Sequence, residues 1–167
     1  MRNLLMLSLI AAATTAVAAD DPTGWSKAHW GMTDNELIQA FGGQVTRFDL
    51  SGRPAAPPPA WLVGIASLEI AGRKFSVTMI PDGAGHLDNI VFSVINPADH
   101  TDSLAQDLEN LLASKYGRPW KTEADNTTDA QWSVGTTVIQ LSRTHLSDPV
   151  YFRLIVLRYH LKSSDPI

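Results

Sequence analysis

Two stretches of the chain alternate apolar with polar residues, and this pattern constrains the fold more than any other feature of the sequence. In residues 74–79 the apolar members are Phe75, Val77 and Met79. Because successive side chains of a β-strand point to opposite faces, a period of two predicts a strand that buries one face. Residues 130–141 repeat the pattern. The alternation therefore predicts an antiparallel sheet with one apolar face.

Turn residues divide these stretches into two successive meanders. The segment Pro-Asp-Gly-Ala-Gly at 81–85 has the composition of a tight turn, and Gly135 supplies a turn in the second stretch. The first meander is predicted to contain strands at 61–71, 74–79 and 87–95. The second is predicted to contain strands at 130–134, 137–141 and 150–158.

A capping box marks the start of a helix before the first meander. Thr33 is followed three residues later by Glu36, so that the hydroxyl and the carboxylate can each accept a backbone N–H from the other residue. The helix is predicted to begin at Asp34. It is predicted to end at residues 42–43, where two glycines can adopt a left-handed conformation.

A stripe of apolar residues at helical spacing predicts a second helix, before the second meander. Either Asp99 or Thr101 can cap its start, and Gly117 followed by Pro119 ends it. Residues three or four apart lie on one side of a helix, so the stripe defines its buried side. Its members are Leu104, Leu108, Leu111, Leu112 and Tyr116.

The order of these elements predicts a single α+β domain at 20–167, an antiparallel sheet packed by two helices. It also suggests an internal duplication of a unit with one helix and three strands, with halves at 30–96 and 99–160. Both predicted helices end in an aromatic residue followed by glycine. Coincidence is the alternative, since helix ends commonly carry glycine. A proline-rich insertion at 52–59 accounts for most of the extra length of the first half.

Residues 1–19 have the organisation of a signal peptide. Arg2 gives a positive start, and an apolar run of ten residues follows at 4–13. This run is shorter than the roughly 20 residues that span a bilayer, and it suits the core of an export signal. An Ala-Val-Ala cleavage site at 16–18 places the mature start near Asp20. The predicted location is the periplasm or the cell exterior, and a buried N-terminal helix is the alternative.

The composition and the motifs exclude several classes of protein. The absence of cysteine excludes thiol catalysis, disulfides, cysteine metal sites and a lipid anchor. The chain has 17 acidic against 13 basic residues, whereas proteins that follow nucleic-acid phosphates have a basic excess. No phosphate-binding glycine loop and no Gly-x-Ser-x-Gly segment occurs. We therefore expect no nucleic-acid partner, no membrane span, no nucleotide chemistry and no serine triad.

Histidine and acidic residues offer the main alternative, a small metal-dependent or carboxylate-based envelope hydrolase. His86 and Asp88 lie two residues apart and would share a face of a strand, and Glu69 has no assigned structural role. His100 and Asp102 have the same spacing. They lie at a predicted helix start, where short polar side chains cap backbone amides. The prediction is therefore that the chain has no catalytic residue, no metal site and no cofactor.

Five tryptophans are a rich supply for a chain of this size. Trp61 follows the proline-rich insertion, and Trp120 lies close to Arg118. Tryptophan and arginine are frequent anchors of protein interfaces, so Trp61, Arg118 and Trp120 form the candidate interaction surface. Burial in the core is the equal alternative for Trp61 and Trp120. Trp132 belongs to the alternating pattern and is predicted to lie in the core.

Two short motifs resemble those of known exported proteins. Residues 30–37 read Trp-Gly-Met-Thr-x-x-Glu-Leu, and residues 115–119 read Lys-Tyr-Gly-Arg-Pro. With the signal peptide, they are similar to a broad group of small exported bacterial proteins. The helix start is similar to that of the small lipoprotein of the outer-membrane β-barrel assembly machine and to the repeated unit of secreted β-lactamase inhibitor proteins. This chain lacks the lipid-bearing cysteine of the first and the disulfides of the second.

The resemblance carries over no functional residue, but it implies a non-catalytic fold that works by binding proteins. We therefore expect a soluble exported protein without enzymatic activity that binds another macromolecule, a protein of the cell envelope, through a sheet face or loops. A small-ligand sensor with an aromatic pocket is a third alternative. The sequence leaves the oligomeric state open.

Overall fold

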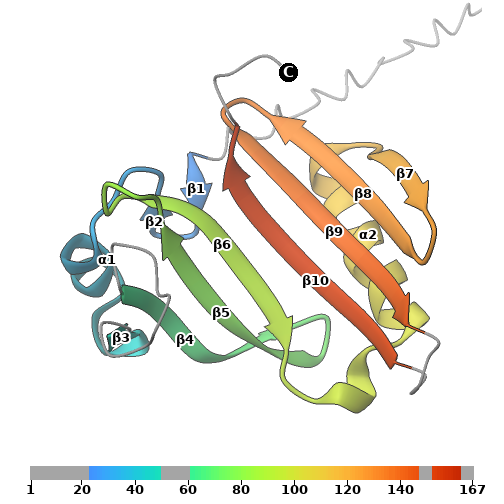
Figure 1. Ribbon diagram of the computed structural model, residues 1–167, viewed down its shortest axis with the longest axis horizontal. Coiled ribbons are helices and arrows are strands. Elements are labelled where there is room, and N and C mark those ends of the chain that lie inside the picture. Colours follow the sequence, from blue (N-terminus) through green and yellow to red (C-terminus); the bar gives the residue numbers. More distant parts are fainter. Residues whose placement is uncertain (1–22, 50–60, 147–151, 163–167) are drawn as a thin grey trace, which may run out of the picture.

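Eight strands form the main sheet of the computed structural model, which describes residues 23–49, 61–146 and 152–162. The strands are β3 (Thr46–Asp49), β4 (Trp61–Ile70), β5 (Arg73–Pro81), β6 (Leu87–Val94), β7 (Trp120–Ala124), β8 (Thr127–Val134), β9 (Thr137–Leu146) and β10 (Phe152–Leu161). Their order across the sheet is β3-β4-β5-β6-β10-β9-β8-β7, and neighbouring strands are antiparallel (Figure 1). The predicted signal peptide at 1–19 and the insertion at 52–59 lie outside the described residues.

Two helices and a small hairpin complete the described fold. The helices are α1 (Asp34–Phe41) and α2 (Asp102–Tyr116), and the hairpin consists of β1 (Gly24–Trp25) and β2 (Ala28–His29). Two short 3₁₀-helices, η1 (Gly42–Gln44) and η2 (Pro97–Asp99), lie in the connections. The capping box predicted for α1 is present, because Thr33 Oγ1 accepts from the Glu36 backbone N–H and the Glu36 carboxylate accepts from the Thr33 backbone N–H at 2.8 Å. The backbone N–H and the hydroxyl of Thr33 both donate to the Glu36 carboxylate, and these two hydrogen bonds lower the pKa of Glu36.

Each helix is followed by four strands that are consecutive in the sheet, β3 to β6 after α1 and β7 to β10 after α2. The predicted α+β class, with an antiparallel sheet and two helices, is confirmed. The sequence predicted three strands after each helix and missed β3 and β7. These two strands have 4 and 5 residues, and all of them are exposed. Because they bury neither face, they show no apolar alternation that could reveal them.

The hydrophobic core lies on one face of the sheet, which we call the core face. On this face Phe75 is opposite Val94, Val77 is opposite Phe92, and Phe92 is in turn opposite Leu157 of β10. Both helices pack on the same face, and in Figure 1 α2 lies behind β8 and β9. Their core residues are Leu37 and Phe41 of α1, and Leu104, Ala105, Leu108 and Leu112 of α2.

The hairpin of β1 and β2 also packs on the core face and contacts both halves of the sheet. The Trp25 ring lies edge-on to Phe92, with 5.0 Å between the ring centroids, and stacks on Phe41 at 6.2 Å. Trp30 Nε1 donates to Oγ1 of the fully buried Thr137 at 2.8 Å. Because Phe92 lies in β6 and Thr137 lies in β9, the hairpin links the two halves.

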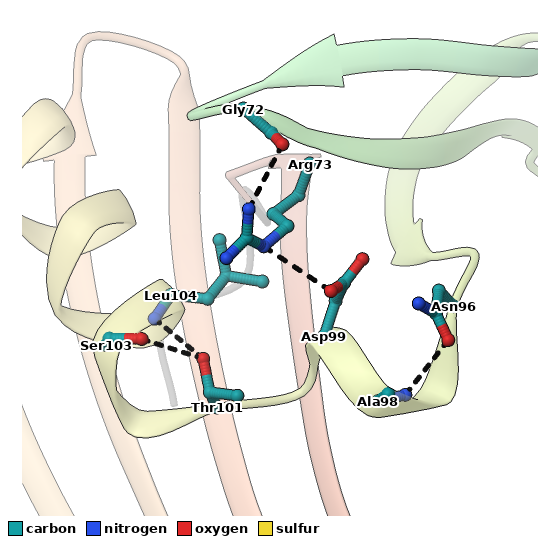
Figure 2. Close-up of polar contacts among 8 residues, drawn as sticks. All are labelled: Gly72, Arg73, Asn96, Ala98, Asp99, Thr101, Ser103 and Leu104. Atoms are coloured by element: carbon teal, nitrogen blue, oxygen red, sulfur yellow. Dashed lines mark hydrogen bonds and ion pairs between the residues drawn. The ribbon is translucent and has the colours of Figure 1, made fainter.

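The connection from β6 to α2 is held by side-chain caps (Figure 2). Asn96 Oδ1 accepts a backbone N–H of η2 at 3.1 Å, and Thr101 Oγ1 accepts one from the first turn of α2 at 3.2 Å. Of the two predicted caps, Thr101 is therefore the N-cap of α2. Asp99 instead pairs with Arg73 Nε at 3.4 Å, which ties the connection to the turn between β4 and β5.

The prediction that the whole apolar stripe of α2 is buried is wrong at one residue. Leu111 is 54% exposed, while Leu108 and Leu112 are buried and Ala105 takes a place in the core. A helix turns by about 100° per residue, so the side of α2 centred between Leu108 and Leu112 includes Ala105 and leaves Leu111 at its margin. Leu111 is therefore apolar although it does not pack against the sheet.

Two matched substitutions on α2 test this orientation. Leu108→Ala is expected to lower the free energy of unfolding by about 2–5 kcal/mol, because it removes a fully buried side chain and leaves a cavity. Leu111→Ala should change it by no more than about 0.5 kcal/mol. Urea denaturation of both variants measures the difference, and equal costs at the two positions would contradict the described face of α2.

Candidate binding surface

The register of the strands aligns a row of side chains across the whole sheet, on the face opposite the core face. Each member is paired with the next by the strand register, so that one residue comes from each strand. We call it the central row. From β3 to β7 it contains Thr46, Gly64, Thr78, Val91, Arg158, Gln140, Gln131 and Trp120.

A second row lies beside the central row and crosses six strands. The register pairs its members in the same way, and they are Ser76, Ser93, Val156, Ser142, Asp129 and Thr122. We call the two rows together the open face, because the described helices and the β1–β2 hairpin pack on the core face. In Figure 1 no helix or strand is drawn in front of β9 and β10. Among these residues, Arg158 and Asp129 carry the formal charges.

An exposed aromatic residue lies at each edge of this face. Trp120 is 68% exposed and is paired with Gln131 of the central row. Successive residues of a strand point to opposite faces, so Trp120 points away from Lys121, whose side chain contacts α2. Phe48 is 50% exposed and lies against Gly64 of the central row. A side chain at Gly64 would meet the Val77 carbonyl oxygen at 3.0 Å and the Phe48 ring at 3.2 Å, so the glycine makes room for both. No sequence pattern points to Phe48, because all residues of its strand are exposed and the strand lacks alternation.

The predicted interaction residues lie in two separate parts of the sheet. Arg118 and Trp120 border a shallow groove of about 510 Å³, which Glu109, Pro119 and Lys121 also line. Burial of Trp120 in the core, the alternative left open by the sequence, is excluded by its exposure.

Trp61 begins β4, and its side chain is not among those described. Five strands lie between β4 and β7, which corresponds to about 29 Å at a spacing of about 4.8 Å. The structure therefore does not bring Trp61 close to Arg118 and Trp120. A binding role for each of the three residues stays a prediction.

The residues of the alternative hydrolase site are not assembled either. His86 is exposed after the turn between β5 and β6, where its backbone N–H donates to Asp82 Oδ1 at 2.9 Å and lowers the pKa of Asp82. Glu69 pairs with Lys74 at the far end of β5. The eight residue steps from Lys74 to Asp82 extend about 26 Å, so Glu69 is remote from His86 and Asp88. In the described part of the chain, no three His, Cys, Asp or Glu side chains converge to hold a metal ion.

His100 and Asp102 have structural partners at the start of α2, but neither caps the helix as their position predicts, because Thr101 is the N-cap. His100 Nδ1 accepts the backbone N–H of Ile155 at 2.9 Å, and burial lowers the pKa of His100 although Asp99 opposes the shift. The Asp102 carboxylate lies 3.2 Å from Arg153 Nη1 and 3.5 Å from Arg143 Nη1. These pairs link the helix start to β9 and β10.

Comparison with known proteins identified no relative. No family model matches the chain, and no curated protein or solved structure matches it. Of the helices in the described ranges, none has the length and the apolar character needed to cross a membrane.

The contrast between two tryptophans tests how the structure divides exposed from buried residues. Trp132 is 3% exposed and donates from Nε1 to the Gly117 carbonyl at 2.7 Å, which confirms its predicted place in the core. Trp132→Ala is expected to lower the free energy of unfolding by about 3–5 kcal/mol. Trp120→Ala should cost no more than about 0.5 kcal/mol, because the ring is mostly in solvent. Chemical denaturation measures both, and a large cost at Trp120 would show that this ring is packed.

Proposed function

We propose that the chain is a non-catalytic binding protein whose open face docks against another protein of the cell envelope. The observation that carries this proposal is an eight-stranded sheet with both described helices on one face and a sparsely charged opposite face. Centres of protein interfaces are depleted in charged residues and enriched in aromatic residues and arginine. The open face shares the low content of charged residues, and it carries Arg158 near its middle and Trp120 at its edge.

The dimensions of the sheet suit such a contact. A standard interface buries about 800 Å² on each partner, which is a patch about 28 Å on a side. Seven spacings of about 4.8 Å separate β3 from β7, so the sheet is about 34 Å wide. Strands β9 and β10 have 10 residues each, which corresponds to about 33 Å of length. The edge strands β3 and β7 are shorter, with 4 and 5 residues, so the longest part of this surface lies over β9 and β10. A partner that docks on paired strands does not incur the cost of ordering a flexible loop.

Export to the periplasm or the cell exterior is part of the same proposal. It rests on the signal peptide expected at 1–19 and on the motifs at 30–37 and 115–119, whose resemblance to exported protein-binding proteins is the second support. In this view the chain is neither anchored by lipid nor held by disulfides, since it has no cysteine.

We also propose that the two halves arose by duplication of a unit with one helix and four strands. Three features support it: the same order of elements in each half, a threonine that caps each helix, and a glycine with positive φ that ends each helix. The caps are Thr33 and Thr101, and the terminal glycines are Gly42 and Gly117. The sequence suggested a unit with three strands, and the proposal now includes the edge strand of each half.

Site-specific photocrosslinking tests the binding proposal. The crosslinking amino acid p-benzoylphenylalanine is placed at Gln140 in the open face or at Asn110, an exposed residue of α2, in the cells that produce the chain. We expect one envelope protein to be crosslinked from Gln140 and not from Asn110. Because Arg158 is the neighbour of Gln140 in the central row, Arg158→Glu should reduce the yield at least about tenfold, the effect of a hot-spot residue.

Two outcomes would contradict the proposal. Equal crosslinking from Gln140 and Asn110 would show that the captured protein does not recognise the open face. Absence of any product from Gln140, in cells where the chain is abundant and folded, would show that this face has no partner there.

A further inference from the structure

Strand β7 ends the sheet next to the groove described above, and it is the element on which this inference rests. Its one strand neighbour in the described part of the chain is β8, and all five of its residues are exposed. An edge strand presents unpaired backbone N–H and C=O groups along its outer side, and these groups can pair with a strand of another molecule. The side chains of β7 indicate which strand can pair with it.

The sequence of β7, Trp-Lys-Thr-Glu-Ala, is complementary to itself when two copies run antiparallel. With Thr122 at the two-fold axis, Lys121 lies opposite Glu123 of the partner subunit, and Glu123 lies opposite Lys121 of the partner subunit. Opposite charges that face each other across a pair of strands stabilise the pair. On the other side of the strand the large Trp120 ring lies opposite the small Ala124 of the partner subunit.

Other registers of the same pair bring like charges together. A pair centred on Lys121 would place two lysines opposite each other, and a pair centred on Glu123 would place two glutamates opposite each other. Charge complementarity therefore selects the register centred on Thr122. Lys121 already contacts Glu109 of α2 at 2.8 Å, and its side chain is half exposed. An ammonium group has three donors, so it can bind a second carboxylate without losing the first.

The other edge of the sheet is a poorer candidate. Strand β3 has 4 residues. If two copies of β3 paired antiparallel, opposite charges would face each other in the register centred on Phe48, where Arg47 lies opposite Asp49 of the partner subunit. Arg47 is already 2.7 Å from Asp34, whose side chain is largely buried at the start of α1. Pairing through β3 would therefore compete with an ion pair inside the chain.

We propose that two copies of this chain associate through antiparallel pairing of β7 with β7, in the register centred on Thr122. The two-fold axis is perpendicular to the sheet, so the open faces of the two copies join on the same side. The occupant of the β7 edge is thus a second copy of this chain. This proposal does not depend on the envelope partner. Five residue pairs form a small contact, so the association is expected to be weak and dependent on concentration.

Sedimentation equilibrium of the full chain over roughly 10 µM to 1 mM tests the proposal. The wild-type chain should show reversible dimer formation. Glu123→Lys places two lysine pairs in the interface, and Lys121→Glu places two glutamate pairs there, so each variant should dissociate at least about tenfold more readily. Thr46→Lys on β3 is the matched control at the other edge, and it should dimerise like the wild type.

A mixture of the two charge variants separates the interface from any effect on the single chain. In a mixed dimer of Glu123→Lys with Lys121→Glu, each lysine again faces a glutamate, so an equimolar mixture should regain the dimer although neither variant forms it alone. Lys121→Glu also loses the contact with Glu109. That loss persists in the mixture and cannot explain a recovery.

Three results would overturn the proposal. They are a wild-type chain that stays monomeric up to about 1 mM, a dimer that the two charge changes leave intact, and a mixture that stays monomeric. A dimer lost in Thr46→Lys would place the interface at β3 instead. Far-ultraviolet circular dichroism of each variant shows whether it is folded, and Glu123→Gln replaces any charge variant that is not.

Discussion

The pairing of β6 with β10 is the contact on which the rest of the architecture depends. Five residue pairs, from Asn89 with His160 to Ser93 with Val156, join strands that are more than sixty residues apart in the chain. The Phe92 and Tyr159 rings pack at this seam with 5.6 Å between their centroids. Burial raises the pKa of Tyr159, and Tyr116 adds to the shift. Without this seam the chain would contain two separate four-stranded sheets.

The seam also decides which surfaces are covered. Because β6 and β10 are antiparallel and their core residues are opposite each other, the apolar sides of both halves face the same way. Both helices and the β1–β2 hairpin therefore pack on that one side and cover the apolar residues of both halves. The same geometry aligns the central row from Thr46 to Trp120 on the other side and leaves β3 and β7 as edges. The proposed binding face and the proposed dimer edge are thus two consequences of one strand pairing.

Local signals predicted the elements that have local causes. The capping box of Thr33 and Glu36 located the start of α1, because its hydrogen bonds join residues close in sequence. Alternation and turn residues located the six inner strands, because a strand that buries one face shows a period of two within its own sequence. The exposed strands β3 and β7 leave no such pattern. Leu111 was assigned to the core because an apolar residue at the margin of a helical stripe looks the same as one at its centre.

The open face was also beyond sequence reasoning. Its composition is ordinary when each strand is taken alone, and it becomes a surface once the order of the strands and their register are known. Trp120 is a predicted interaction residue, but its neighbours in the central row, Gln131, Gln140 and Arg158, come from three other strands. Nothing local connects them, because long-range pairings such as Val91 with Arg158 place them in one row.

Hydrogen exchange of the backbone amides measured by NMR tests the continuous sheet most directly. If the seam joins both halves into one cooperative unit, the slowest amides of β5 and β6 and those of β9 and β10 should exchange with one common free energy of opening, equal to that of global unfolding. If the amides of β5 and β6 exchange through an opening that leaves β9 and β10 protected, the halves unfold separately. That result would contradict the claim that both halves depend on the β6–β10 seam.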